Sequence, residues 1–100
     1  MKMTAGKLND FIRDLVVEAE SVVATRRVHS SHGVISSIWV DLEKYTKLRA
    51  KCALLSSMLP PKANAWKATL EDEKNSLYSH AVETVGVLKA IQEAADGELL

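Results

Sequence analysis

Apolar residues in the first quarter of the chain recur every three or four positions. They are Leu8, Phe11, Ile12, Leu15, Ala19, Val22 and Val23. This spacing lies along one stripe of an α-helix, so it predicts a helix from Thr4 to Arg27. Val16 and Val17 widen the apolar face, which favours a helix that is covered on two sides.

The helical spacing stops after Arg27. The stretch from Val28 to Gly33 is mostly polar and ends in glycine, so it is predicted to be a loop. The next stretch, Val34–Val40, is a short apolar run that periodicity alone does not assign to helix or strand. A strand in an otherwise helical chain would lack a partner, but the pattern leaves both interpretations open.

Helical spacing resumes near Asp41 and continues to Met58. The apolar stripe of this second helix consists of Leu42, Tyr45, Leu48, Cys52, Leu55 and Leu59. Asp41 is a suitable N-cap, because its carboxylate can accept one of the free backbone N–H groups of the first turn. Pro60 and Pro61 end the helix, because the residue before a proline is forced out of helical geometry.

Two further helices are predicted, from Lys62 to Glu73 and from Leu77 to Ala95. Their inner faces consist of Ala63, Trp66 and Leu70 in one, and of Tyr78, Ala81, Val82, Val85, Leu88, Ile91 and Ala95 in the other. Gly97 is expected to close the last helix in the left-handed conformation. Four amphipathic helices with short connections predict an all-α fold, a small bundle in which residues 1–100 form one domain.

Composition narrows the classes of function without selecting one. Thirteen Lys and Arg residues balance thirteen Asp and Glu residues, so no net charge draws the chain toward nucleic acid or an anionic membrane. No apolar run approaches the roughly 18 residues that a membrane span requires. The single cysteine excludes an internal disulfide and favours a reducing, cytoplasmic setting. Neither a membrane nor a nucleic-acid partner is predicted.

Several apolar and aromatic residues are candidates for a protein interface, because one small core leaves some of them uncovered. They are Val16, Val17, Trp39, Tyr45, Leu99 and Leu100. Buried aromatic residues dominate interface energies, which makes Trp39 and Tyr45 the best anchors. The alternative is that the aromatic residues belong to the core and the aliphatic ones are scattered over the surface. On the first interpretation the chain forms a homo-oligomer or binds another protein.

Arg26, Arg27, His29 and His32 form the densest polar cluster. Basic residues at a helix C-terminus commonly interact with the helix dipole, which is one interpretation of the two arginines. The other is a phosphate-binding site for a nucleotide ligand, because guanidinium groups donate paired hydrogen bonds to phosphate. Two histidines without a nearby cysteine or carboxylate do not complete a zinc site, so no metal and no cofactor is predicted.

Arg27 and His32 also match the Arg-x4-His spacing of HEPN-type RNases, in which both residues act on the RNA phosphate. Val28 stands where that family usually carries a polar residue. No other catalytic motif is present: the chain has no glycine-rich phosphate loop, no Gly-x-Ser-x-Gly and no Cys-x-x-Cys. An HEPN-like RNase is therefore kept only as a weaker alternative.

The remaining polar features are predicted to be structural. Cys52 lies on an apolar stripe and is expected to be a small core residue. His80 is expected at the rim of the last helix with a hydrogen bond, and the carboxylates of residues 71–73 are expected on a solvated surface. A basic stripe on the second helix consists of Lys44, Lys47 and Lys51, with Arg49 beside it.

Several short groups of residues resemble a known module. They are Gly33-Val34-Ile35, Trp39-Val40-Asp41-x-x-x-Tyr45-x-x-Leu48 and Cys52-x-x-Leu55, followed by Gly86-Val87-Leu88-Lys89-Ala90-Ile91 and Asp96-Gly97-Glu98-Leu99-Leu100. Together they are similar to a small helical N-terminal module of uncharacterised bacterial and phage proteins. In longer members it precedes a domain associated with abortive infection, and it carries tryptophan where this chain has Leu48. The resemblance implies an adaptor, multimerisation unit or decoy linked to phage or bacterial defence, and no catalytic residue.

The leading hypothesis is a non-enzymatic helical protein–protein interaction or multimerisation module that acts through apolar faces. The alternative is a small oligomeric protein that sequesters a nucleotide. In the first case the candidate interface residues carry the function, and in the second Arg26, Arg27, His29 and His32 hold the phosphates.

Overall fold

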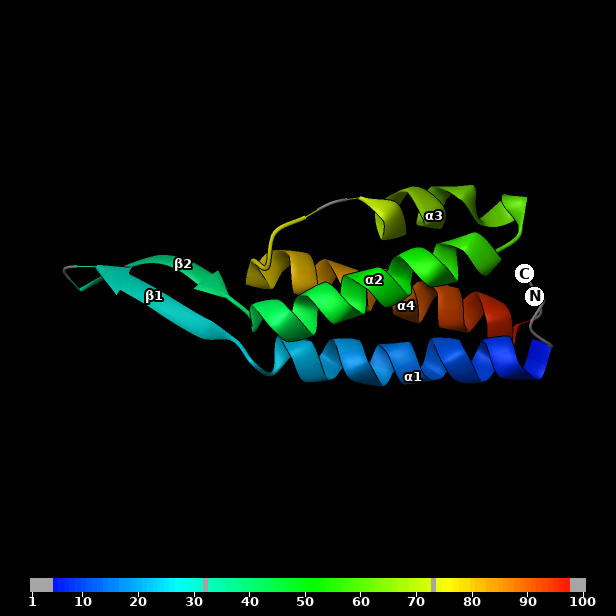
Figure 1. The fold of residues 1–100 in the computed structure, drawn as a ribbon, viewed down its shortest axis with the longest axis horizontal. Coiled ribbons are helices and arrows are strands. Elements are labelled where there is room, and N and C mark those ends of the chain that lie inside the picture. The colour runs from blue at the N-terminus through cyan, green and yellow to red at the C-terminus, as the bar shows by residue number, and fades with distance from the viewer. Residues whose placement is uncertain (1–4, 32, 73, 98–100) are drawn as a thin grey trace.

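The computed structural model describes residues 5–31, 33–72 and 74–97. Four α-helices form an elongated bundle in this part of the chain, and a β-hairpin projects from one end of it (Figure 1). The elements in chain order are α1 (Ala5–Val23), β1 (Arg27–Ser31), β2 (Val34–Trp39), α2 (Leu42–Met58), the short 3-10 helix η1 (Pro61–Ala63), α3 (Asn64–Glu71) and α4 (Tyr78–Asp96). The molecule measures 52 × 23 × 21 Å. The prediction of an all-α fold built on a small helical bundle is confirmed.

The hydrophobic core runs between α1, α2 and α4. α1 packs along both α4 and α2, and α3 covers α2 from the other side. Ile12, Leu48 and Leu88, one from each of the three long helices, are fully buried. Most of the predicted stripes therefore meet in one seam, whose members include Leu15, Ala19, Val22, Cys52, Leu55, Leu70, Ala81 and Ile91. No helix in the described ranges is both long and apolar enough to span a membrane.

The stretch predicted to be a loop pairs with the stretch left unassigned. β1 and β2 run antiparallel, with Arg27 facing Trp39 at the base and Ser31 facing Val34 near the tip. The prediction of a loop is therefore wrong for residues 28–31, Gly33 lies in a turn, and residues 34–39 are extended. The partner strand is the adjacent segment, whose serines and histidines do not indicate a strand. Strand preference depends on structural context more than on composition.

α1 is also shorter than predicted, because the chain leaves the helix after Val23 to enter the hairpin. Gly33 lies in the turn of the hairpin with φ of 79°. This is the left-handed region, where glycine has no Cβ to clash with the backbone. The glycine that the sequence analysis took as the end of a loop thus lies in the turn between two strands.

The ends of the other helices test three further expectations. The Asp41 cap is confirmed, because its side chain accepts the backbone N–H of Lys44 at 2.9 Å. Leu42 was predicted to lie on the inner stripe, but 65% of its surface is exposed. Gly97 has φ of −85° and ψ of 6°, so the left-handed C-terminal glycine was also wrong. The last helix ends without the backbone reversal that such a glycine allows.

The fully buried Leu48 allows a direct test of this core. Leu48→Ala is expected to lower the free energy of unfolding by about 2–5 kcal/mol, because it leaves a cavity between α2 and its neighbours. Leu54→Ala on the same helix is the matched control, since Leu54 is 53% exposed. Its expected effect is within about 0.5 kcal/mol. Urea denaturation followed by circular dichroism measures both, and equal losses would contradict this core.

Candidate functional site

The hairpin leaves the bundle at a point fixed by hydrogen bonds to the backbone. The Thr25 hydroxyl donates to the carbonyl of Val22 at 2.6 Å and accepts the N–H of Asp41 at 2.8 Å. The N–H of Val40 donates to the carbonyl of Ser76 at 2.9 Å. The base of the hairpin is thereby joined to the end of α1, the start of α2 and the segment before α4. These bonds hold the hairpin in a defined direction away from the core.

The two edges of the hairpin differ in how they are covered. At the base of β2, Trp39 forms a bridge with Leu77, which occupies part of the outer edge of that strand. Trp39 is half-buried there, and its indole N–H donates to the hydroxyl of Ser37. The outer edge of β1, which faces away from β2, meets no strand among the residues that the structure describes. Its backbone donors and acceptors are therefore free to pair.

Arg26 and Arg27 of the predicted phosphate-binding cluster lie at this same end of the bundle. α1 carries no basic residue in its last turn, so the helix-terminus interpretation of Arg26 and Arg27 is wrong. Arg26 stacks on the ring of Tyr78, with its guanidinium carbon 5.4 Å from the ring centroid. Arg27 begins β1 and is exposed. Only the backbone of His29 is described, and His32 lies outside the described residues.

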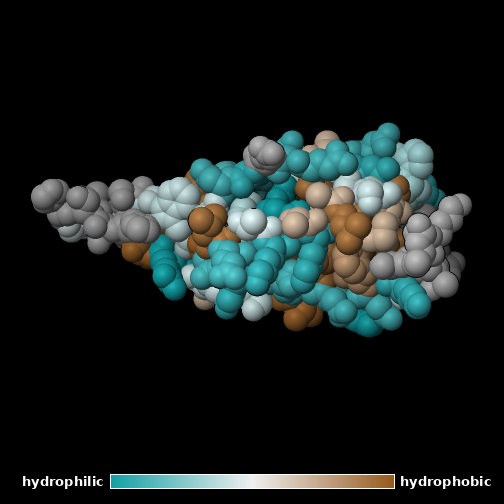
Figure 2. Space-filling model, in the orientation of Figure 1, coloured by the Kyte–Doolittle hydropathy of each residue, from teal (hydrophilic) through white to brown (hydrophobic). Residues whose placement is uncertain are grey.

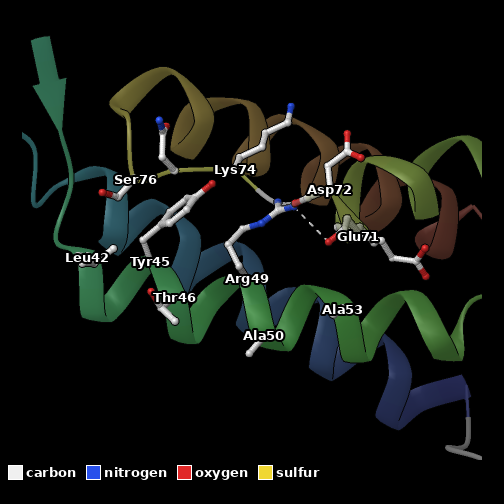
Figure 3. Close-up of a pocket in the computed structure, with 12 residues that line it drawn as sticks. Leu42, Tyr45, Thr46, Arg49, Ala50, Ala53, Glu71, Asp72, Lys74 and Ser76 are labelled. Atoms are coloured by element: carbon white, nitrogen blue, oxygen red, sulfur yellow. Dashed lines mark hydrogen bonds between the residues drawn. The ribbon is translucent and has the colours of Figure 1, made fainter.

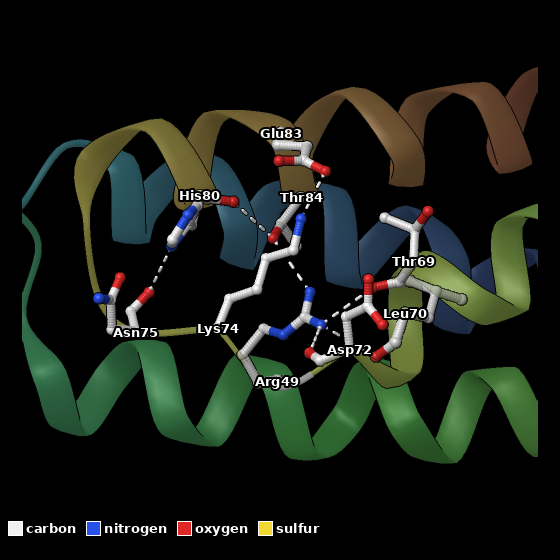
Figure 4. Close-up of polar contacts among 9 residues, drawn as sticks. All are labelled: Arg49, Thr69, Leu70, Asp72, Lys74, Asn75, His80, Glu83 and Thr84. Carbon is white, nitrogen blue, oxygen red and sulfur yellow. Dashed lines mark hydrogen bonds and ion pairs between the residues drawn. The ribbon is translucent and has the colours of Figure 1, made fainter.

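Arg49 forms the densest set of hydrogen bonds in the bundle (Figure 4). One guanidinium nitrogen, Nη2, donates to the carbonyls of Thr69 at 3.0 Å, Leu70 at 3.2 Å and Asp72. The other, Nη1, donates to the hydroxyl of Thr84 at 3.2 Å. The last carbonyls of a helix lack partners within the helix, and Arg49 supplies them for α3. This one side chain of α2 therefore connects to both α3 and α4.

The segment between α3 and α4 is called here the α3–α4 link, and its described residues are Asp72 and residues 74–77. A second group of contacts holds this link. Lys74 pairs with Glu83 at 2.7 Å, and this hydrogen bond lowers the pKa of the Glu83 carboxyl. The Nδ1 atom of His80 lies 3.1 Å from the carbonyl oxygen of Asn75. His80 is therefore a rim histidine with a hydrogen bond, as predicted. These polar groups hold the link in place.

A groove of about 520 Å³ opens between α2 and the α3–α4 link (Figure 3). Tyr45 and Arg49 point from α2 toward the link, as Figure 3 shows. Burial raises the pKa of the Tyr45 phenol, while Arg49 and the Thr84 hydroxyl act in the opposite direction. Among the described residues the Tyr45 hydroxyl has no hydrogen-bond partner of standard geometry. The other lining residues include Leu42, Thr46, Ala50, Ala53, Glu71 and Ser76.

Several of the polar side chains that line the groove are engaged in contacts within the fold. Its two cationic side chains, Arg49 and Lys74, are committed to the contacts described above. Glu71 accepts a hydrogen bond from the Ser56 hydroxyl at 2.8 Å. Within the described ranges, no group of three or more His, Cys, Asp or Glu side chains could hold a metal ion. These contacts hold α3 and the link in place.

Sequence reasoning missed the role of Arg49, which it placed beside the basic stripe of α2. A signal for this role was present. Arg49 lies four residues after Tyr45 and three before Cys52, both of which are buried. That spacing puts all three on one face of the helix, so the Arg49 side chain starts next to the core. Lys47 and Lys51 instead pair at the surface with Glu43 and Glu18.

The candidate interface residues separate into buried and exposed ones. Val16 is 5% exposed, so the expectation that the core leaves it uncovered is wrong. Tyr45 is 2% exposed, which agrees with the alternative that this aromatic residue belongs to the core. Val16 is covered because α1 packs against two helices, and Tyr45 because the α3–α4 link closes over α2. Val17 is 64% exposed, as predicted. Leu99 and Leu100 lie outside the described residues.

Cys52 is a fully buried core residue, which confirms its prediction. Burial raises the pKa of its thiol to about 11, with Arg49 lowering it and Glu18 raising it further. The thiolate is the reactive form of cysteine, so a thiol with this pKa is a poor nucleophile at neutral pH. Cys52 is therefore not a candidate catalytic residue.

Comparisons of the chain with protein-family models, with curated proteins and with solved structures find no match. The function therefore has to be argued from the geometry of the residues themselves. That geometry offers two features: a groove whose charged groups hold the fold, and a hairpin with one uncovered edge.

Replacing Arg49 by methionine tests its role in holding α3. Arg49→Met removes the donor to the part-buried carbonyls of Thr69 and Leu70, so we expect the free energy of unfolding to fall by about 1.5–3 kcal/mol. Lys47→Met is the matched control on the same helix, because its pair with Glu43 is exposed and contributes little. Urea denaturation compares the two variants. Equal stability of both would show that the carbonyl contacts of Arg49 contribute nothing.

Alkaline pH tests the burial of Cys52. The folded state keeps the thiol protonated up to about pH 11, whereas the unfolded thiol loses its proton near its ordinary value of 9.0. The stability that this group contributes is present below that ordinary value and is lost as the pH rises through the raised one. The loss is on the order of 2 kcal/mol. Cys52→Ala should show a flatter fall in stability over this range, and parallel curves would contradict the shift.

Proposed function

We propose that the chain is a non-enzymatic interaction module that self-associates at the hairpin end of the bundle. The observation that carries this proposal is the hairpin itself. It projects beyond the helices, its base is held by hydrogen bonds to three other segments, and the outer edge of β1 is uncovered in the described part of the chain. A rigidly held, unpaired strand edge is a surface prepared for another chain.

The use of the polar side chains supports a role without catalysis. Arg49 and Lys74, the cations of the largest groove described, hold backbone carbonyls and Glu83. Arg26 stacks on Tyr78, so it is engaged away from any phosphate-binding arrangement with Arg27. The nucleotide-binding and RNase alternatives both need these arginines to converge with histidines on one phosphate. Of these side chains the structure describes the two arginines, of which Arg26 contacts Tyr78 and Arg27 is exposed.

Exposed apolar side chains accompany the hairpin. Val28 on β1 is 47% exposed, and Leu42 at the start of α2 is 65% exposed. Figure 2 shows hydrophobic side chains beside the hairpin, separated by a hydrophilic surface from those at the other end of this face. The chain carries no net charge, so two copies meet without long-range repulsion. The proposed partner is therefore a second copy, and the proposed setting is the cytoplasm, where Cys52 stays a thiol.

A pair of exposed leucines tests where self-association occurs. Leu42→Glu places a charge at the hairpin end, and Leu54→Glu places one farther along the same helix, about 18 Å away. The two leucines are 65% and 53% exposed, so neither change disturbs the core. We expect Leu42→Glu to weaken the dimer about tenfold or more, because a symmetric interface carries the change twice. Leu54→Glu should have no effect.

Native mass spectrometry over a range of protein concentrations measures the dimer fraction of each variant. A wild-type chain that stays monomeric at high concentration would overturn the proposed function. Equal weakening by both variants would show that self-association occurs elsewhere on the surface. A discrete adduct of a few hundred daltons would instead favour the nucleotide-binding alternative.

A further inference from the structure

We infer that β1 pairs with β1 of a second copy, in antiparallel orientation, to form a four-stranded sheet across two molecules. This inference rests on the proposed function and names the contact through which self-association would occur. The two hairpins would lie side by side in the order β2, β1, β1 of the second copy and β2 of the second copy. A two-stranded hairpin is marginally stable in water, and pairing the two outer edges adds the strands that it lacks.

The outer edge of β1, unlike that of β2, is available for pairing with another strand. The outer edge of β2 is occupied at its base, where Trp39 bridges to Leu77, and the next residue, Val40, donates to Ser76. A strand approaching from that side would collide with this segment. The outer edge of β1 has no such neighbour in the described ranges. Its backbone therefore offers the longer free run of donors and acceptors.

The residues of β1 include little that prevents pairing between copies. Natural edge strands are commonly blocked by inward-facing charges, lysines or prolines. β1 reads Arg-Val-His-Ser-Ser, so its only permanent charge is Arg27, at the end nearest the bundle. The four residues that follow contain no lysine, proline or carboxylate. The hairpin has a β-bulge between His29 and Ser30, but its extra residue, Ser36, lies on β2. The middle and the tip of the β1 edge therefore carry no permanent charge and no proline.

The hydrogen-bond pattern of a sheet restricts the register of such a pair. In an antiparallel pair, facing residues either both direct their backbone groups toward the partner or both direct them away. These two states alternate from one residue to the next along a strand. Two facing residues must be in the same state, so in a pair of identical antiparallel strands one residue faces the same residue of the other copy. Full overlap of Arg27–Ser31 places His29 at this central position. Arg27 then lies opposite Ser31 of the second copy, so no like charges face each other.

The area of such a contact indicates its strength. β1 is about 17 Å long, and a sheet with its side chains is about 10 Å thick, so edge pairing covers only a narrow strip. A standard interface buries about 800 Å² per partner. The surface of the chain is 6381 Å², so this would be about an eighth of it. Edge pairing alone covers less than this, so the contact is smaller than a standard interface. We expect a weak, concentration-dependent dimer.

A cysteine placed at the central position reports this register. In the four-stranded sheet, residue 29 of one copy lies opposite residue 29 of the other, within the Cα distance of about 4.4–6.8 Å that a disulfide requires. His29→Cys is therefore expected to cross-link under mild oxidation. Ser37→Cys is the matched control, because Ser37 faces His29 on β2. The two copies of residue 37 would be three strand spacings apart, about 14 Å, too far to form a bond.

Non-reducing electrophoresis and peptide mass spectrometry identify the linked residues, and the buried Cys52 remains as an internal reference in both variants. Circular dichroism confirms that each variant keeps its helices. As a second measurement, the backbone N–H groups of β1 should exchange with solvent more slowly at high protein concentration, while those of α3 should not change. A 29–29 disulfide together with this protection would establish the contact.

The outcomes separate this inference from the proposed function. A wild-type dimer in native mass spectrometry, with no 29–29 disulfide and no protection of β1, would overturn the edge pairing and leave self-association standing. Cross-linking of Ser37→Cys in place of His29→Cys would assign the contact to β2 and overturn it as well. A wild-type chain that stays monomeric in every measurement would overturn both.

Discussion

The structure depends on the burial of one aliphatic seam between α1, α2 and α4. α1 and α4 contain 19 residues each, and their apolar stripes run the length of the bundle. Each stripe is covered only when the other two helices are in place, as the full burial of Ile12, Leu48 and Leu88 shows. Removing apolar surface from water is the main favourable term in folding. Between α1 and α2, Val40 joins this core, while the two strands that precede it extend outward as the hairpin.

The short helix α3 depends on this bundle for its stability. It has eight residues, fewer than the 12–15 or so that an isolated helix needs in water. Leu70 attaches it to the core, and Arg49 supplies the donors that its C-terminal carbonyls lack. The same guanidinium contacts Thr84 on α4. The groove beside Arg49 is thus a consequence of how α3 is held, since its charged groups are already engaged.

The hairpin end combines features that do not serve the core. Thr25, Asp41 and Ser76 fix its base, while the outer edge of β1 carries backbone groups with no strand beside them in the described residues. A fixed base lowers the entropy lost when the edge meets a partner, because the strand is already extended. Val28 on β1 and Leu42 at the start of α2 add exposed apolar surface at this end of the bundle. These features together support a module whose work is association.

Sequence alone determined the helices, because the signal for an amphipathic helix is local. Apolar residues three and four positions apart share a face wherever the helix is placed, and the Asp41 cap acts on a residue only three positions away. Tertiary structure alone decided the hairpin, which of Val16 and Val17 is buried, and the role of Arg49. Each of these depends on a partner that no local sequence pattern identifies. β1 needs β2, Val16 needs a second helix, and Arg49 needs the carbonyls of α3, which are some twenty residues away. Contacts between residues far apart in the sequence depend on which surfaces the folded bundle leaves exposed. Those surfaces are determined only when the whole chain has packed.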